Sequence, residues 1–109
     1  QPLNNWNVSN VTNMQIMFFN SPFNQNISSW NTSNVTNMFA MFASSPFNQN
    51  ISSWNVSNVT NMERMFDSNS SFNQDLSAWC VSHIATEPTN FSNSTPNWTL
   101  PKPNWGAPC

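Results

Sequence analysis

Residues 27–50 of the chain read ISSWNTSNVTNMFAMFASSPFNQN, and close copies of this stretch lie on both sides of it. Tryptophan marks the register at intervals of 24, 24 and 25 residues, at Trp6, Trp30, Trp54 and Trp79. Valine, methionine and phenylalanine recur in the same register, and each copy closes on Phe-Asn-Gln. Because self-similarity at a period of roughly 20–50 residues is the signature of stacked repeats, we expect a repeat architecture.

Each repeat shows two hydrophobic patterns, which predict two kinds of element. Residues 27–32 resemble a short strand with mixed facing. The four apolar residues that follow are spaced like one face of a helix, at Val35, Met38, Met41 and Phe42. Asn34 is a typical helix N-cap, and Pro46 ends the helical stretch. Each unit is therefore predicted to run strand, turn, short helix and loop.

Such a unit cannot bury its apolar side alone, and about three stacked units are needed for a stable core. The predicted fold class is an α/β repeat solenoid with an irregular, disulfide-closed C-terminal cap. Residues 1–79 are assigned to the solenoid and residues 80–109 to the Pro- and Trp-rich cap. The solenoid divides into units 1–26, 27–50 and 51–75, with a fourth unit starting at residue 76.

The cap contains the two features that close a repeat array, apolar side chains and a covalent link. Phe91, Trp98 and Trp105 are expected to cover the exposed end of the core. Cys80 and Cys109 form an even count in a lysine-poor chain, which favours a disulfide and an oxidising compartment. A metal or redox pair is the alternative, but it needs further His or Cys ligands, and the chain has one histidine.

The N-terminal side has no comparable cap, because the chain enters in mid-unit. An open solenoid end exposes core side chains and unpaired backbone groups. We therefore expect self-association through this N-terminal face, with a second copy covering it.

The tryptophan, methionine and phenylalanine columns are interpreted as core, because every column repeats in register. An aromatic platform for a ligand is the alternative. Asn24, Asn48 and Asn73 also recur, and we expect them to form an internal ladder that bonds the backbone of neighbouring repeats.

Composition argues against several classes of function. Charged residues make up 6% of the chain and only two are cationic, so no nucleic-acid partner is expected. No apolar run has the roughly 18 residues that a membrane span needs. Acid–base catalysis needs positioned titratable groups, and His83 with four scattered carboxylates does not supply them, so we expect neither an enzyme nor a metal or cofactor. His83 replaces Asn58 of the previous repeat and is expected to form a hydrogen bond.

The motif Trp-Asn-Val-Ser-Asn-Val-Thr-Asn-Met, followed by Met-Phe and Phe-Asn-Gln, resembles the BspA-like leucine-rich repeat surface proteins, a repeat first grouped as a mycoplasma domain of unknown function. The resemblance covers residues 1–79 and extends into the tail at Trp79-Cys80-Val81, Glu87-Pro88 and Trp105-Gly106. It implies a leucine-rich-repeat-like solenoid, a secreted or cell-surface location and, loosely, adhesion. It implies no catalytic residues.

Asparagines replace the family's usual aspartates after the repeat tryptophan and after Phe-Asn-Gln, and each replacement creates an Asn-x-Ser sequon. Asn-x-Ser/Thr is the acceptor pattern for N-glycosylation. The favoured candidates are Asn7, Asn26, Asn31, Asn50, Asn55, Asn90, Asn93 and Asn97. The less favoured candidates, for which a structural role is the alternative, are Asn10, Asn34, Asn58 and Asn69.

These observations predict a non-enzymatic, secreted or cell-surface structural or adhesive protein that carries covalent glycans and assembles end-to-end into extracellular filaments. The alternative is a binding module that recognises glycans, or ice, through polar ladders on the solenoid surface. One such ladder is expected at Thr12, Thr36 and Thr60.

Overall fold

Backbone hydrogen bonds join each repeat to the neighbouring repeat, alongside tight turns within the repeat. In the computed structural model, which describes residue 3 and residues 6–109, the N–H of Phe18 donates to Met41 O at 3.0 Å. One repeat further on, the N–H of Phe42 donates to Met65 O at 2.8 Å. The N–H groups of residues 14, 16, 18 and 20 all follow this pattern. These donors are consequently unavailable for the bonds to residue i−4 that an α-helix requires.

The predicted α/β fold class is therefore wrong. Residues 3 and 6–109 contain no helix and no strand, only isolated parallel bridges that join Asn13 to Asn37 and Asn37 to Asn61. The expected helix is a series of tight turns, with Met41 N–H donating to Met38 O at 3.2 Å and a left-handed residue at Ala40 (φ 52°). A left-handed residue interrupts helical geometry, which explains why helix-like spacing does not produce a helix here.

The expected strand at residues 27–32 is also wrong. It begins with a turn in which the N–H of Trp30 donates to Ile27 O at 3.1 Å. The side chain of Asn26 reinforces that turn by accepting from the N–H of Ser28 at 2.9 Å. Short polar side chains that bond to nearby backbone compete with extended pairing, so these residues bend the chain.

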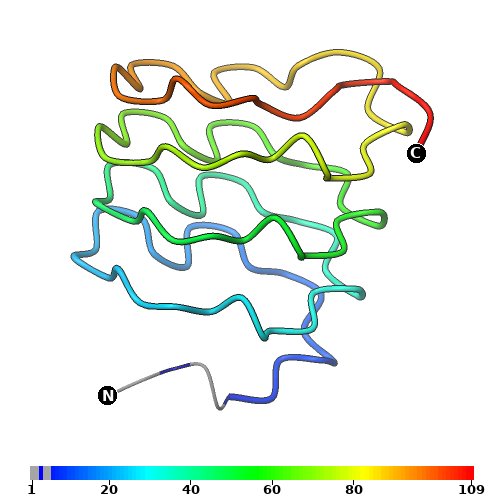
Figure 1. Cartoon of the computed structure of the whole chain (residues 1–109). Coiled ribbons are helices and arrows are strands. Elements are labelled where there is room, and N and C mark those ends of the chain that lie inside the picture. Colours follow the sequence, from blue (N-terminus) through cyan, green and yellow to red (C-terminus); the bar gives the residue numbers. More distant parts are fainter. Residues whose placement is uncertain (1–2, 4–5) are drawn as a thin grey trace.

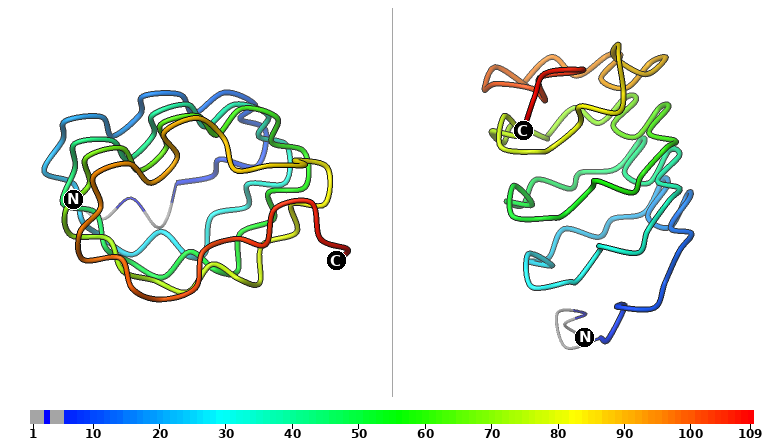
Figure 2. Two further views of the ribbon diagram at one scale, coloured as in Figure 1. Left: turned by 90° about the horizontal axis from the view of Figure 1, so that it is seen from above. Right: turned by 90° about the vertical axis from the view of Figure 1, so that its right-hand side faces the viewer.

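Successive repeats lie one above another as irregular coils, which Figure 1 shows from the side and Figure 2 from above. We call them coil 1 (up to residue 26), coil 2 (27–50), coil 3 (51–75) and coil 4 (76–99), followed by a tail (100–109). The radius of gyration is 12.7 Å. This is close to the roughly 13 Å expected for a compact domain of about 100 residues.

Aromatic rings fill the interior in columns that cross the coils. The rings of Phe18 and Phe42 stack at 5.7 Å, and those of Phe42 and Phe66 stack at 5.5 Å. Trp30 and Trp54 stack at 6.3 Å, with planes only 5° apart. Offset stacks of this kind add attraction beyond the area that they bury. The interpretation of the aromatic columns as core is confirmed.

The asparagine ladder is confirmed as well. Oδ1 of Asn24 accepts from the N–H of Asn48 at 2.8 Å, and Oδ1 of Asn48 accepts from the N–H of Asn73 at 2.9 Å. The ladder ends at the tail, where Oδ1 of Asn73 accepts from Thr99 and Leu100. These bonds fix the register of each coil on the next.

The C-terminal residues continue the stack and then close it. The N–H of Phe66 donates to Phe91 O at 2.9 Å, so Phe91, which the sequence placed in the irregular cap, continues the fourth coil. Trp98 meets the rings of Phe66 and Phe72 edge-on, at interplanar angles of 78° and 73°. These edge-on rings end the stacked columns. The predicted disulfide is confirmed, with the Cα atoms of Cys80 and Cys109 5.3 Å apart.

Candidate functional site: asparagine rows and the two ends

Three rows of sequon asparagines run along the stack, each with at most one member per coil. The first row holds Asn7, Asn31 and Asn55, all exposed. In coil 2, Oδ1 of Asn31 accepts from the backbone N–H of Ser33 at 3.0 Å and from its hydroxyl at 2.7 Å. The same pair of bonds recurs in coils 1 and 3. The Nδ2 atoms of these three asparagines have no hydrogen-bond partner among the described residues.

The second row consists of Asn26 and Asn50, and Asp75 continues it in coil 3. Oδ1 of Asn50 accepts from the N–H of Ser52 at 2.9 Å. Hydrogen bonds from the Ser77 hydroxyl and, secondly, the Ser77 N–H hold the pKa of the exposed Asp75 carboxyl below its usual value of 3.8. A polar hollow of about 330 Å³ lies along this row, lined by asparagine, glutamine and serine side chains of coils 1 to 3.

The third row, Asn10, Asn34 and Asn58, is exposed but is bonded into the stack. Nδ2 of Asn34 donates to Ser9 O at 2.7 Å, and Nδ2 of Asn58 donates to Ser33 O at the same distance. His83 follows in coil 4, where Nε2 lies 2.7 Å from Val59 O. The hydrogen-bonding role expected for His83 is therefore confirmed. Asn10 is at the start of the row and has no such bond with a described residue.

The remaining candidates differ sharply in burial. Asn69 is completely buried, and its Nδ2 donates to the carbonyl oxygens of Phe42 and Phe47 at 3.4 and 3.1 Å. Asn93 and Asn97 are exposed, but their Nδ2 atoms donate to Asp67 Oδ1 at 3.2 Å and to Ser70 O at 2.6 Å. Asn90 is exposed, and its side chain has no bond within the described chain.

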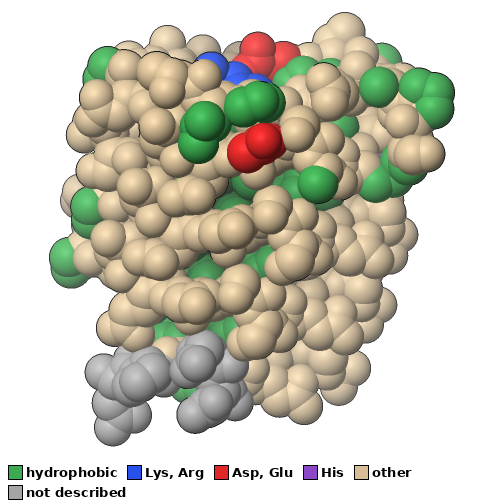
Figure 3. Space-filling model, in the orientation of Figure 1, with side chains coloured by type: hydrophobic (Ala, Val, Ile, Leu, Met, Phe, Trp, Pro, Cys, Tyr) green, Lys and Arg blue, Asp and Glu red, His purple; other side chains and the backbone are tan. Residues whose placement is uncertain are grey.

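The titratable side chains of the described residues are dispersed over coils 3 and 4 and the tail. Within the described residues, no group of three His, Cys, Asp or Glu side chains is placed to hold a metal ion. The exposed Arg64 and the partly buried Asp67 form an ion pair at 3.1 Å. The molecular face in Figure 3 is mostly uncharged polar, with its acidic and basic side chains near the C-terminal end. The part of the chain that the structure describes has no helix long and apolar enough to cross a membrane.

The comparisons with known proteins identify a family. The family model described as "Mycoplasma protein of unknown function, DUF285" matches residues 1–102. The chain belongs to this family. No curated protein and no solved structure matches it. The description of the DUF285 family names no activity, so a function has to be argued from the geometry.

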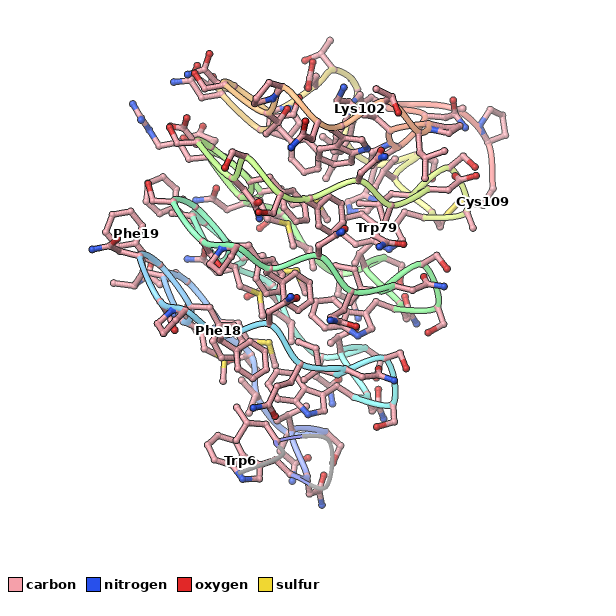
Figure 4. All side chains as sticks on the ribbon, turned by 60° about the vertical axis from the view of Figure 1, so that its left-hand side comes forward. Trp6, Phe18, Phe19, Trp79, Lys102 and Cys109 are labelled. Atoms are coloured by element: carbon pink, nitrogen blue, oxygen red, sulfur yellow. A yellow bond between two sulfur atoms is a disulfide. The ribbon has the colours of Figure 1, made fainter. Side chains whose placement is uncertain are left out.

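The two ends of this DUF285 chain differ in how far they cover the core. Phe91 is completely buried in coil 4, and Trp105 packs edge-on against it at 4.9 Å. In coil 1 the side chain of Trp6 is 55% exposed, whereas its counterpart Trp30 is 4% exposed. Figure 4 shows Trp6 at the N-terminal end of the stack, beyond Phe18. Among the described residues, large apolar side chains are therefore more exposed in coil 1 than in coil 4.

A second apolar surface lies on the flank of the DUF285 coils. Exposed Ile16 and Phe19 line a hollow of about 340 Å³ together with Phe39 of coil 2. The Arg64–Asp67 ion pair lies at its rim. Sequence reasoning did not single out this hollow. The sequence does contain a signal for it. Ile16 and Phe19 are large and apolar, whereas the equivalent residues one repeat later are Ala40 and Ala43.

Proposed function

We propose that this DUF285 chain is a non-enzymatic structural or adhesive protein, secreted or held at the cell surface, that carries N-linked glycans and associates end-to-end. The Cys80–Cys109 disulfide supports an oxidising, extracellular setting, because disulfides are rare in reducing compartments. The repeat motif resembles that of BspA-like surface proteins, and a relationship to them supports the same location.

The observation that carries the self-association is the unequal covering of the two ends. The exposed fractions of Trp6 (55%) and Met17 (37%) leave large apolar side chains in contact with water at coil 1. Grouped apolar exposure of this kind marks an interaction surface in soluble proteins. When the end of one copy contacts the opposite end of the next, the contact does not close on itself and produces a filament.

Sedimentation velocity of the purified chain over a wide concentration range tests the proposal, together with electron microscopy of the native material. We expect association that rises with concentration and weakens in a W6Q/M17Q variant. F19Q is the matched control, because Phe19 is equally apolar and 51% exposed but lies on the flank. A monomer at every concentration, or equal weakening by the control, contradicts end-to-end association.

A binding module for glycans is the second candidate, and the polar hollow beside Asn50 favours it. Amide and hydroxyl groups of Asn26, Gln49 and Ser53 line the hollow, and such groups suit a polyhydroxylated ligand. The threonine column has fewer hydrogen-bond donors left for a ligand, because the hydroxyls of Thr36 and Thr60 already donate to carbonyl oxygens at 3.1 and 3.2 Å. A glycan array tests the hollow, and a thermal-hysteresis assay tests the column as an ice-binding surface.

A further inference from the structure

The sequon asparagines of this structure differ in whether their Nδ2 atom donates a hydrogen bond to a neighbouring coil. We infer that N-linked sugars are carried by exposed asparagines whose Nδ2 is free, and that asparagines whose Nδ2 bonds a neighbouring coil stay unmodified. The inference rests on the proposed extracellular, glycosylated function. Among the described residues, the free group is Asn7, Asn26, Asn31, Asn50, Asn55 and Asn90, and the bonded group is Asn34, Asn58, Asn69, Asn93 and Asn97.

The chemistry explains why Nδ2 decides the outcome. The donor is a lipid-linked sugar diphosphate, a co-substrate of the modifying enzyme. Nδ2 forms a bond to the anomeric carbon of the first sugar, while the bond from that carbon to the phosphate oxygen breaks. The lipid diphosphate leaves with the electron pair, and Nδ2 loses one proton to a base. The product is an amide with a single N–H and a bulky substituent on the nitrogen.

The first and second rows accept this substituent without losing a contact. Their Oδ1 atoms already take the hydrogen bonds that hold the local turn, as in Asn55 and Ser57 at 3.0 and 2.6 Å. Glycosylation leaves Oδ1 unchanged, so the turn is kept. Because hydrogen-bonded coils lie about 4.8 Å apart, sugars on successive coils of one row crowd each other, and partial occupancy within a row is expected.

The bonded group has fewer N–H groups with which to keep its contact when it is modified. Nδ2 of Asn34 lies 2.7 Å from Ser9 O of coil 1, so a sugar on that nitrogen is attached within hydrogen-bonding distance of the neighbouring coil and leaves a single N–H to keep the bond. Asn97 is held in the same way, 2.6 Å from Ser70 O. Asn69 is inside the core, where a sugar has no space. We therefore expect the stack to disfavour modification at these positions.

Asn55 and Asn58 supply a comparison within one coil. Asn55 begins the tripeptide Asn-Val-Ser and Asn58 begins Asn-Val-Thr, and both are acceptor patterns. An enzyme that recognises only the tripeptide does not exclude either. The structure separates them, because Nδ2 of Asn58 donates to Ser33 O at 2.7 Å and Nδ2 of Asn55 has no bond with a described residue.

The test is site mapping on the native, folded protein. Amidase release of N-glycans in ¹⁸O-labelled water converts each occupied asparagine to a labelled aspartate, which peptide mass spectrometry locates. We expect label at Asn7, Asn26, Asn31 and their free counterparts, and none at the bonded group. Label at Asn34 and Asn58 equal to that at Asn31 and Asn55 overturns the inference.

A separate measurement distinguishes failure of the inference from failure of the proposed function. Fractionation of the source material and thiol labelling show whether the chain is extracellular with an intact disulfide. An extracellular, disulfide-bonded chain with no label overturns the inference alone. An intracellular chain with free thiols contradicts the proposed function, and the absence of label then overturns the inference with it.

Discussion

The indole N–H of Trp54 donates to the carbonyl oxygen of Ile27 in the preceding coil, at 3.1 Å. Trp30, Trp79 and Trp98 make the same kind of bond to the coil before them. We expect W54F to lower the free energy of unfolding by about 1–2 kcal/mol, because it removes one of the two hydrogen bonds that Ile27 O accepts and shrinks a stacked ring. Urea denaturation measures this loss. W6F is the control and should change stability by less than about 0.5 kcal/mol, since Trp6 is exposed.

Asn69 should be among the most sensitive polar residues of the chain. Its buried amide donates to two carbonyl oxygens and accepts from the N–H groups of Ser71 and Phe72 at 3.0 and 2.9 Å. We expect N69A to cost about 2–4 kcal/mol, because four backbone groups lose their partner in the core. Thermal unfolding by circular dichroism measures the change. An effect no larger than that of N10A, at an exposed asparagine, would sink this prediction.

The disulfide should stabilise the C-terminal end of the stack most. It joins residues separated by 29 positions, for which the chain-entropy estimate is about 3–4 kcal/mol. We expect the C80S/C109S pair to unfold at lower temperature and to exchange backbone amides faster in coil 4 and the tail than in coil 2. Hydrogen exchange with mass spectrometry resolves these segments. Uniformly faster exchange along the whole chain would contradict a local role.

The contribution of Asp75 to folding stability should depend on pH in the acid range. A carboxyl whose folded-state pKa lies below its unfolded value stabilises the fold above that unfolded value, and the contribution is lost as pH falls through the folded pKa. For Asp75 this loss falls below about pH 4, and it is small because the group is fully exposed. S77A should raise the pKa of Asp75 towards 3.8, measured by NMR titration of the carboxyl carbon. S52A, next to an asparagine in the preceding coil, should leave that pKa unchanged.

The repeat period, the aromatic core, the asparagine ladder and the disulfide were predictable because each depends on residue identity recurring in register. The local backbone was not. Met38, Met41 and Phe42 fit one face of a helix, yet the same spacing fits a series of tight turns with left-handed residues. Hydrogen bonds to the neighbouring coil decide between the two, and a single-sequence period cannot show them.

The candidate site was predictable in part for the same reason. Sequence placed Asn93 and Asn97 with the favoured sequons, on their tripeptide pattern and their position in the C-terminal part of the chain. The structure ties both to coil 3. Asn69 takes the position of Ser45, a buried serine whose Oγ accepts from the N–H of Phe47 at 3.1 Å. The alignment of Asn69 with Ser45 in the repeat was the sequence feature that could have indicated a buried position.

The coil-to-coil bonds described above join residues about one repeat apart, from Thr12–Thr36 at the start of the chain to Val81–Gly106 at its end. A duplication or deletion of one whole 24-residue unit, such as residues 27–50, therefore places each donor opposite an equivalent acceptor. Unequal recombination within the gene could lengthen or shorten the molecule in steps of one coil while both end structures stay intact. The number of coils can therefore change while the contacts between neighbouring coils stay the same.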